Sequence, residues 1–237
     1  MGGIAEMIRA FMTALTLLPA PAFADFTANN LLAIFYHELG HAVIDQMQVP
    51  IFGQEEDAAD SLSILLIDAL YDSDDAEVIA YDSASLFWAE AQDEPAFWDT
   101  HGPDEQRYFN TVCLFYGADP DAREDFASDL ELPQERADGC EDEFAMASDS
   151  WNGVLDEMSK SNALKGKLVL QAGAENSVIS QEIKALNVEF SWPRDIPVKL
   201  EDCGEANAFY DLDEPSITMC RELTGWLSGI AKQISTN

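Results

Sequence analysis

The segment from residue 29 to 48 constrains the fold most, because it combines one helical stripe with two closely spaced histidines. Its apolar residues recur at steps of three and four, which predicts a helix with a single face toward the core. They are Leu32, Phe35, Leu39, Val43 and Met47. Asn29 or Asn30 can cap the start of this helix, and Pro50 lies just beyond its expected end. The fold must therefore bury this stripe against other elements.

The expected partner of this helix is the next segment, "EEDAADSLSILLIDALY" at residues 55–71. It has the same helical periodicity, and Glu55, Glu56 and Asp57 in its first turn suit the positive end of the helix dipole. Only the short turn "VPIFGQ" separates the two segments, so we expect the two helices to pack against each other.

The remainder of the chain predicts more helices and a few late, short strands. Further helical segments are expected at residues 76–91, 104–117, 133–158 and 221–234. Strand-like segments, each bounded by turn residues, are expected at residues 167–172, 186–192, 196–203 and 216–220. The chain has no internal repeat and no low-complexity tract. This pattern predicts an α+β fold, with one mainly helical domain over residues 25–237 and a small antiparallel sheet.

The chain is strongly acidic. Its 237 residues include 45 Asp and Glu against 12 Lys and Arg, a formal net charge of -33. Such a charge repels phosphate backbones and anionic lipid headgroups, so nucleic acid is not an expected partner. A solvated surface suited to salt is the simplest explanation of the acidity. No Lys or Arg occurs between Arg9 and Arg107, so a buried carboxylate in that interval needs either solvent or a metal ion.

Residues 1–24 have the pattern of an export signal. The apolar run "AFMTALTLL" is followed by "PAPAFA", in which small residues precede Asp25 in an A-x-A pattern. We therefore expect a mature chain that begins near Asp25 and is secreted or periplasmic. A buried amphipathic helix is the alternative, because Arg9 is the one basic residue of the segment. No later apolar run approaches the roughly 20 residues of a stable membrane span.

Four cysteines fit an exported protein with two disulfides. They are Cys113, Cys140, Cys203 and Cys220. Three pairings are possible, and proximity in the sequence favours Cys113 with Cys140 and Cys203 with Cys220. A zinc site built from cysteines is the competing explanation, but the sequence has no CxxC pair.

The five residues HELGH, at positions 37–41, form a pattern with a chemical meaning. Positions i and i+4 of a helix share a face, so His37 and His41 can direct ring nitrogens at one metal ion. Glu38 can then reach a metal-bound water as a general base. The alternative is two surface histidines on a helix, but the neighbouring residues are apolar. Gly40 lowers helix stability, which suggests that something approaches the backbone there.

A catalytic zinc site needs a third protein ligand, and no histidine follows within the next two turns. The second helix offers carboxylates instead. Glu56 and Asp60 are four residues apart and share a face. Glu56 can therefore bind the metal while Asp60 accepts the free ring N–H of a histidine. Glu55 and Asp60 are the alternatives for the ligand, and a solvated first turn is the simplest role for Glu55.

These motifs resemble the gluzincin type of zinc metallopeptidase, in which HExxH is followed on a later helix by ExxxD. The segments "FYHELGHAVID", "PIFGQEEDAAD", "DEQRYFNTVCLFYG" and "CGEANAFYDLDEPSITMC" are more closely similar to DUF4344, a bacterial group of predicted metallopeptidases. The resemblance implies a zincin-like domain that binds one Zn2+ per chain through His37, His41 and Glu56. It also implies that Glu38 is the base and that Asp60 holds a histidine ligand.

The third histidine of the chain, His101, lies in "WDTHGPDEQR". This stretch is similar to a segment that supplies an oxyanion-stabilising histidine in some gluzincins, although Gly102 stands where a proline is expected. Zinc carries only part of the negative charge of the transition state, so a further fixed donor has a clear use. A surface loop histidine is the alternative for His101, and Tyr210 is another candidate for the donor. Arg107 is expected to pair with nearby acids.

The late segment "NAFYDLDEPSITM" is similar to the strand that forms the edge of the cleft in several gluzincins. In this chain it follows the helix with the histidines, so the order of elements is rearranged. The resemblance places Asn207, Ala208 and Phe209 along an extended peptide held by main-chain hydrogen bonds. The alternative is a core hairpin closed by Cys203 and Cys220.

Together these residues predict an exported zinc-dependent peptidase that acts on a peptide or protein substrate without a covalent intermediate. The alternative is a secreted metal-binding or interaction protein on an inactive gluzincin-like scaffold. Glu38 and the lack of a visible fourth ligand favour the peptidase. Hydrolysis of a non-protein amide, such as a cell-wall peptide, would use the same residues. The acidic surface favours cationic or neutral substrates over acidic ones.

Overall fold

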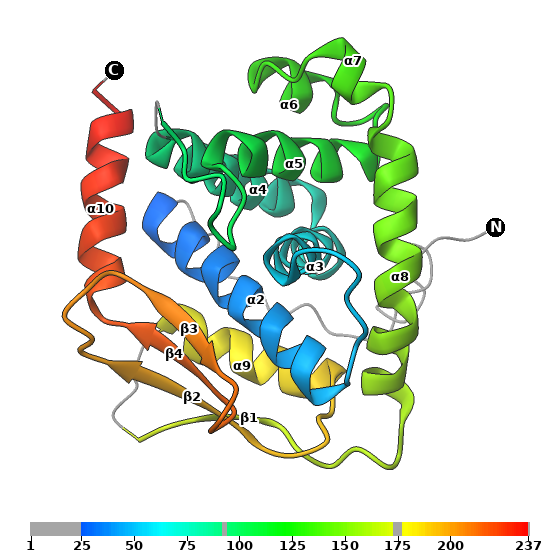
Figure 1. Cartoon of the computed structure of the whole chain (residues 1–237), viewed down its shortest axis with the longest axis vertical. Helices are drawn as coiled ribbons and strands as arrows, with labels where there is room; N and C mark the ends of the chain where they lie inside the picture. Colours follow the sequence, from blue (N-terminus) through cyan, green and yellow to red (C-terminus); the bar gives the residue numbers. More distant parts are fainter. Residues whose placement is uncertain (1–24, 92–93, 173–176, 237) are drawn as a thin grey trace.

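The computed structural model describes residues 25–91, 94–172 and 177–236 (Figure 1). The export signal expected at residues 1–24 lies outside the described residues. The helices are α2 (Phe26–Gln46), α3 (Glu55–Leu70), α4 (Ser73–Glu90), α5 (Asp104–Gly117), α6 (Glu124–Asp129), α7 (Gln134–Ala137), α8 (Cys140–Lys160), α9 (Ser177–Glu189) and α10 (Glu222–Ile234). The strands are β1 (Leu168–Leu170), β2 (Ile196–Glu201), β3 (Ala208–Asp211) and β4 (Ser216–Cys220). The predicted α+β class, mainly helical, is confirmed.

Helix α2 runs through the middle of the molecule and carries HELGH. Figure 1 shows α4 and α5 above it, the sheet below it, and α10 and α8 at the two sides. Its predicted stripe lies in the core, where Leu32, Phe35, Leu39 and Val43 are at most 2% exposed. Because α2 contacts α3, α4, α9, α10 and the strands β3 and β4, it connects all parts of the fold.

Helix α2 starts earlier than the sequence predicted. Its N-cap is Asp25, whose carboxylate accepts a hydrogen bond from the backbone N–H of Thr27 at 3.0 Å. Asn29 and Asn30, the predicted caps, instead lie inside the helix and donate to Asp82 of α4. The prediction was wrong because a carboxylate four residues earlier already satisfies the free N–H groups of the first turn.

Helix α3 packs closely against α2, as the short link between them predicted. At their crossing, a Cβ atom on Gly40 would lie only 2.8 Å from the Cα of Ala59. Further along the same pair of helices, the Ser63 hydroxyl of α3 donates to the Ala33 carbonyl of α2 at 3.0 Å. The absence of a side chain at Gly40 therefore allows α3 to pack closely against α2.

The four strands form one sheet in the order β1-β2-β4-β3. The sequence predicted an antiparallel sheet, but only β3 and β4 are antiparallel, while β1–β2 and β2–β4 are parallel. The β1–β2 pair is parallel because α9 connects the two strands and returns the chain to the same end of the sheet. Strand β4 is parallel to β2 because the chain reverses twice between them, into β3 and back into β4. Strand β4 is buried along its whole length, and β3 lies at the edge.

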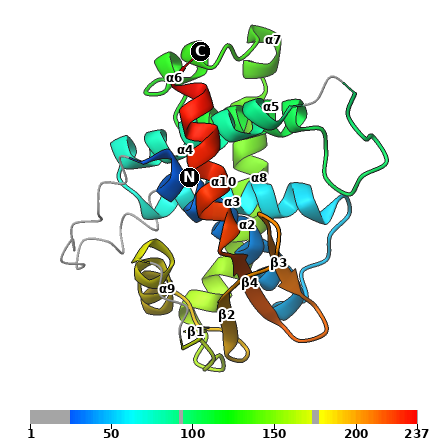
Figure 2. The ribbon, with the colours of Figure 1, turned by 90° about the vertical axis from the view of Figure 1, so that its left-hand side faces the viewer.

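The strand expected at residues 186–192 is not present. Residues up to Glu189 belong to α9, which packs against α2 and β1 (Figure 2). Ile179, Ile183 and Leu186 form its buried stripe, at helical spacing. Beyond the helix, Trp192 is buried and forms an isolated bridge with Gly166. The β-type residues near 188 are thus the end of a helix, because burial of its stripe outweighs local strand propensity.

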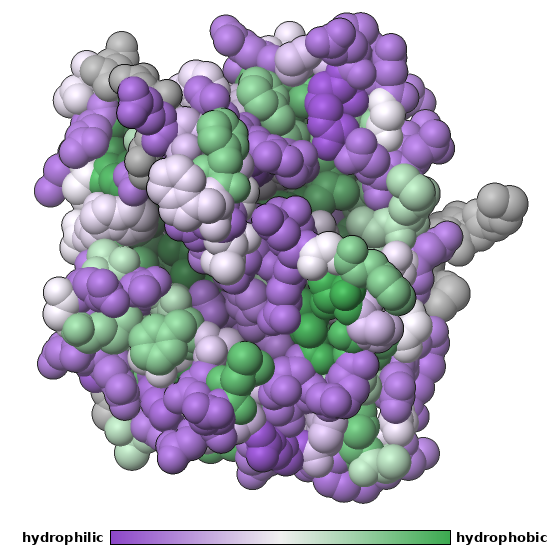
Figure 3. Space-filling model, in the orientation of Figure 1, coloured by the Kyte–Doolittle hydropathy of each residue, from purple (hydrophilic) through white to green (hydrophobic). Residues whose placement is uncertain are grey.

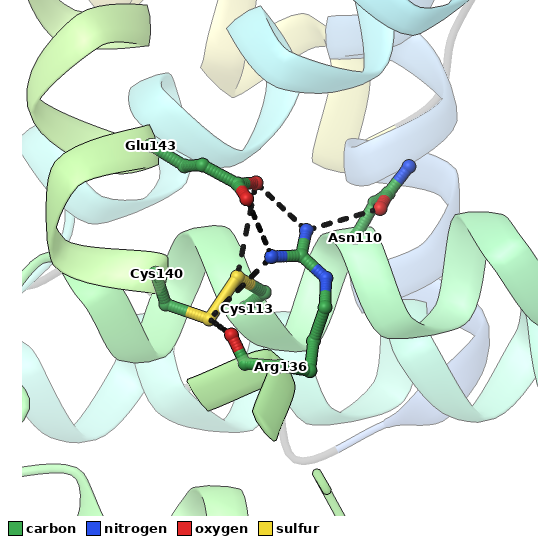
Figure 4. The surroundings of a disulfide bond; sticks show 5 residues. All are labelled: Asn110, Cys113, Arg136, Cys140 and Glu143. Atoms are coloured by element: carbon green, nitrogen blue, oxygen red, sulfur yellow. Dashed lines mark hydrogen bonds and ion pairs between the residues drawn. A yellow bond between two sulfur atoms is a disulfide. The ribbon is translucent and has the colours of Figure 1, made fainter. Parts of the chain in front are cut away.

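Both predicted disulfides are present, Cys113–Cys140 and Cys203–Cys220. Figure 4 shows the first bond, which joins α5 to the start of α8. Beside it the Arg136 guanidinium donates to both carboxylate oxygens of Glu143 at 2.6 and 2.7 Å. The second bond joins the end of β4 to the loop after β2. Among the described residues, no helix is long and apolar enough to cross a membrane.

Candidate metal centre

Three side-chain atoms from α2 and α3 converge on one point. His37 Nε2 and His41 Nε2 lie 3.2 Å apart, and each lies 3.2 Å from Oε2 of Glu56. The three side chains are only 12 to 19% exposed. Among the described residues, these atoms form a cluster of the size that could hold a metal ion.

The spacing of this triangle fits a small tetrahedral ion. An ion with bonds of about 2.0 Å holds its ligand atoms about 3.3 Å apart, close to the observed edges. Two imidazoles and a carboxylate are also a donor set that zinc accepts readily. The cluster supplies three ligand atoms and lines a cavity, so water or substrate could take the fourth position of a tetrahedral ion.

Asp60 contacts His37 at Nδ1, the ring nitrogen that is not part of the cluster. Its Oδ1 lies 2.7 Å from His37 Nδ1, one α3 turn beyond Glu56. A carboxylate at Nδ1 fixes the ring tautomer that leaves Nε2 free for a metal. Arg107 of α5 in turn donates to both oxygens of Asp60 at 2.8 and 2.9 Å. Arg107 therefore pairs with a nearby acid, as expected, and this pair links α5 to the centre.

Glu55 has the same relation to the second histidine, which the sequence analysis did not foresee. Its Oε1 lies 2.8 Å from His41 Nδ1, so Glu55 is not merely a solvated residue of the first turn. A signal for this contact was available. In two antiparallel helices joined by a short link, residues nearer the link face each other, which pairs His41 with Glu55 and His37 with Asp60.

The pKa shifts of His37 and Glu56 show that this centre favours positive charge. Burial lowers the pKa of His37, but the hydrogen bonds with Asp60 and Glu56 outweigh it and raise the pKa to about 9. Burial raises the pKa of the Glu56 carboxyl, but its contacts with His101, His37 and His41 hold the pKa well below the usual range. Positive charge at this point, from protons or a metal ion, thus stabilises Glu56 as a carboxylate.

Glu38 lies next to the ligands but outside their cluster. It is 6% exposed and lines the same cavity as the two histidines. Burial raises the pKa of its carboxyl, although His37 and His41 oppose that rise in part. A carboxylate with a raised pKa and access to the cavity has the properties of a general base.

His101, from the loop between α4 and α5, also reaches the centre. Its Nε2 lies 2.9 Å from the same Oε2 of Glu56, and its ring stacks beside His37 with centroids 6.1 Å apart. It does not belong to the cluster of ligand atoms. Tyr210, the other candidate donor, is engaged by α2, since its hydroxyl donates to Asp45 at 2.6 Å. His101 thus contacts Glu56 directly, whereas Tyr210 contacts Asp45 of α2.

A cavity of about 880 Å³ opens over the candidate metal centre. Figure 3 shows this face of the molecule, with a hollow between the helices above and the sheet below. Asn207, Ala208 and Phe209 line the cavity, and the last two belong to the edge strand β3. The structure thus brings the three residues of the late segment together with HELGH.

The comparison with protein families agrees with this geometry. A family model described as "Putative metallopeptidase" (DUF4344) matches residues 10–155 and 157–236. The chain belongs to the DUF4344 family. No curated protein and no solved structure matches it. The description of the DUF4344 family as metallopeptidases suggests a metal, and His37, His41 and Glu56 could bind one in this chain.

Proposed function

We propose that this DUF4344 protein is a zinc-dependent peptidase that binds one Zn2+ per chain. The observation that carries the proposal is the triangle of His37, His41 and Glu56, with edges of 3.2 Å and an open fourth position. Glu38, buried beside this triangle, supports a catalytic role over a purely structural one. A metal site that only stabilises a fold has no use for an additional acid that is not a ligand.

The proposed reaction is hydrolysis of a peptide bond by water. When bound, zinc supplies a Lewis acid that polarises the scissile carbonyl and makes water more acidic. Glu38 accepts the proton of the attacking water and delivers it to the nitrogen of the leaving amine. Its raised pKa suits both steps, because the carboxylate takes the proton readily and the acid returns it. Asp60 and Glu55 keep the histidine rings oriented meanwhile.

His101 and the edge strand complete the proposal. We assign to His101 the donation of a hydrogen bond to the oxyanion, because it is a cavity-lining donor next to Glu56. Among the described residues, strand β3 pairs with β4 alone, so its other edge could hydrogen-bond an extended peptide. Main-chain pairing of this kind holds substrates of many sequences.

We further propose that the peptidase acts outside the cytoplasm. The two disulfides support an oxidising compartment, because disulfide bonds are rare in proteins of reducing compartments. The export pattern of residues 1–24 points the same way.

Metal analysis combined with a cleavage assay tests the function. The chain from Asp25 onward is purified as wild type, Glu38→Gln and Glu157→Gln, the last being an exposed glutamate on α8. We expect one bound zinc in all three proteins, with cleavage of a mixed peptide library by wild type and Glu157→Gln only. Bound zinc without cleavage by the wild type would favour a metal-binding protein that is not an enzyme. If no zinc were bound, HELGH would not be a zinc site.

A further inference from the structure

The lining of the cavity over the candidate metal centre has parts of different chemistry. The part from α3 and the α4–α5 loop is polar, with Gln54, Glu55, Glu56, Asp99, Thr100 and His101. Another part is apolar and consists of Ala33, Ile34, Leu86, Phe87, Leu223 and Trp226, which we call the apolar pocket. Hydrophobic residues also gather in the left part of the hollow in Figure 3.

Three helices far apart in the sequence build the apolar pocket. Ala33 and Ile34 lie one turn before HELGH on α2, Leu86 and Phe87 come from α4, and Leu223 and Trp226 come from α10. Figure 2 shows α10 crossing in front of α2. The hydroxyls of Thr27 and Ser228, 3.2 Å apart, join α2 to α10. The pocket walls are therefore fixed by packed helices.

The pocket adjoins the reacting groups. Ile34 precedes Glu38 by four residues and His37 by three, so it shares their helix face. A peptide held with its scissile bond at Glu38 must therefore place a neighbouring side chain against Ile34. Arg107, whose guanidinium lies 4.2 Å from the centre of the Phe87 ring, is the nearby cation, and Asp60 already accepts two of its hydrogen bonds.

Charge and burial determine what the pocket accepts. None of these six residues is ionisable, and Glu90, which lines the cavity one turn after Leu86, is exposed to solvent. A charged substrate side chain would therefore lose its water against the six residues without gaining a partner among them. An apolar side chain would gain by leaving water. The cavity lining also includes Asn30, which is fully buried and whose Oδ1 has no hydrogen-bond partner among the described residues. This oxygen could accept a hydrogen bond from the hydroxyl of a substrate tyrosine.

We propose that the apolar pocket binds a large apolar side chain of a residue flanking the scissile bond. The enzyme is thus specific for peptides with Leu, Met, Phe or Tyr at one fixed position, despite its acidic surface. This inference rests on the proposed peptidase function for its placement of the substrate, and its test must distinguish the two.

Two substitutions change the size of the pocket. Ala33→Leu fills it and Trp226→Ala enlarges it, while Ala231→Leu on α10 and Trp88→Ala on α4 are matched changes outside the cavity lining. In wild type we expect cleavage sites with a large apolar residue at one position. Ala33→Leu should lower kcat/KM for Phe relative to Ala at that position by about 10-fold or more, since a few methylene groups have effects of that size. The two matched variants should keep the wild-type preference.

A binding measurement separates the pocket from the chemistry. Fluorescent pentapeptides that differ only at one central residue are titrated into Glu38→Gln, and their Kd values are read by polarisation. We expect peptides with Phe or Leu to bind about 10-fold tighter than those with Glu or Lys, and Ala33→Leu in the same background to remove this difference.

Each outcome decides one of the two claims. Cleavage and binding without preference for a large apolar residue would overturn the pocket and leave the peptidase standing. Preferential binding by Glu38→Gln without turnover by wild type would support the pocket and overturn the peptidase. A preference that Ala33→Leu leaves unchanged would also overturn the pocket.

Discussion

Gly40 and Ala59 determine how closely the two helices of the metal centre approach each other. Since an added Cβ on Gly40 would lie 2.8 Å from backbone Cα of Ala59, Gly40→Ala must push α3 away from α2. Glu56 would then move away from both histidines. We expect zinc affinity to fall by at least about 10-fold, as for other changes that misplace a ligand. The free energy of unfolding should fall by about 1–3 kcal/mol, the usual cost of overpacking.

Gly153→Ala is the matched control for this prediction. Gly153 lies inside α8, and an added Cβ would meet no atom within 4 Å. Alanine should therefore raise stability by up to about 1 kcal/mol through helix propensity and leave zinc affinity unchanged. Zinc titration and urea unfolding measure both quantities. If Gly40→Ala also raised stability and kept full zinc affinity, the lack of a side chain at Gly40 would not be required for the close packing of α3 or for zinc binding.

The role of His101 can be separated from that of the ligands. Its Nε2 contacts Glu56, yet it stands outside the cluster of ligand atoms. As a donor to the oxyanion, it should matter for turnover, so His101→Ala at saturating zinc should lower kcat by about 100-fold or more. KM should change little. Steady-state kinetics at several zinc concentrations provide the measurement.

The zinc dependence of this variant distinguishes two roles. If added zinc restored the kcat of His101→Ala to the wild-type value, His101 would position Glu56 for the metal instead of acting on the substrate. Bound zinc, measured on the same samples, serves as the internal control.

At the scale of elements, prediction succeeded where neighbours in the sequence decide the structure. Helix α5 spans Asp104–Gly117, the residues given by its periodicity, and α3 begins at the acidic residue expected. Helix α9 was missed although Ile179, Ile183 and Leu186 recur at helical spacing, because Val188, Phe190 and Trp192, at and beyond its end, favour a strand. The parallel β1–β2 pair depends on the path of α9, and the parallel β2–β4 pair depends on the position of β4 between β2 and β3, so neither follows from a local pattern.

Glu182 ties α9 to α2 and to the end of α3. It is 9% exposed and accepts hydrogen bonds from the hydroxyls of Tyr36 at 2.6 Å and Tyr71 at 2.8 Å. Burial raises the pKa of its carboxyl, although the two tyrosines lower it in part. The folded state therefore binds this proton more tightly than the unfolded state, and stability is lost as pH rises from the unfolded pKa through the folded one.

Glu182→Gln should remove this loss. Relative to wild type, the variant should gain stability as pH rises above the usual Glu pKa of about 4.3, because the amide never ionises. Urea unfolding of both proteins in EDTA, at several pH values, gives the difference in free energy of unfolding. Glu157→Gln, at an exposed position, should show no such trend. A difference for Glu182→Gln that is constant or falls with pH would contradict the assignment.

For the molecule as a whole, the sequence was sufficient to propose metal ligands, which the structure brings together, but not to predict their surroundings. His37, Glu38 and His41 follow from local helix geometry, and Glu56 follows from a helix joined by a short link. The cavity, by contrast, combines side chains of α2, α3, α4, α5, α10 and the β3–β4 hairpin. No local pattern indicated that Trp226 lies near HELGH, because that proximity depends on where the last helix packs.

The net charge of -33 predicts a protein stabilised by salt. The many surface acids repel each other at low ionic strength, and added salt shortens the range of this repulsion from about 30 Å at 0.01 M to about 3 Å at 1 M. The Tm in EDTA should therefore rise steadily with NaCl over that range. The opposite-charge pairs, such as Arg136 with Glu143, are too few to reverse the trend, since 12 basic residues face 45 acidic ones. A Tm that is constant or falls with NaCl would mean that local ion pairs outweigh the overall repulsion, and equimolar sucrose controls for effects unrelated to charge.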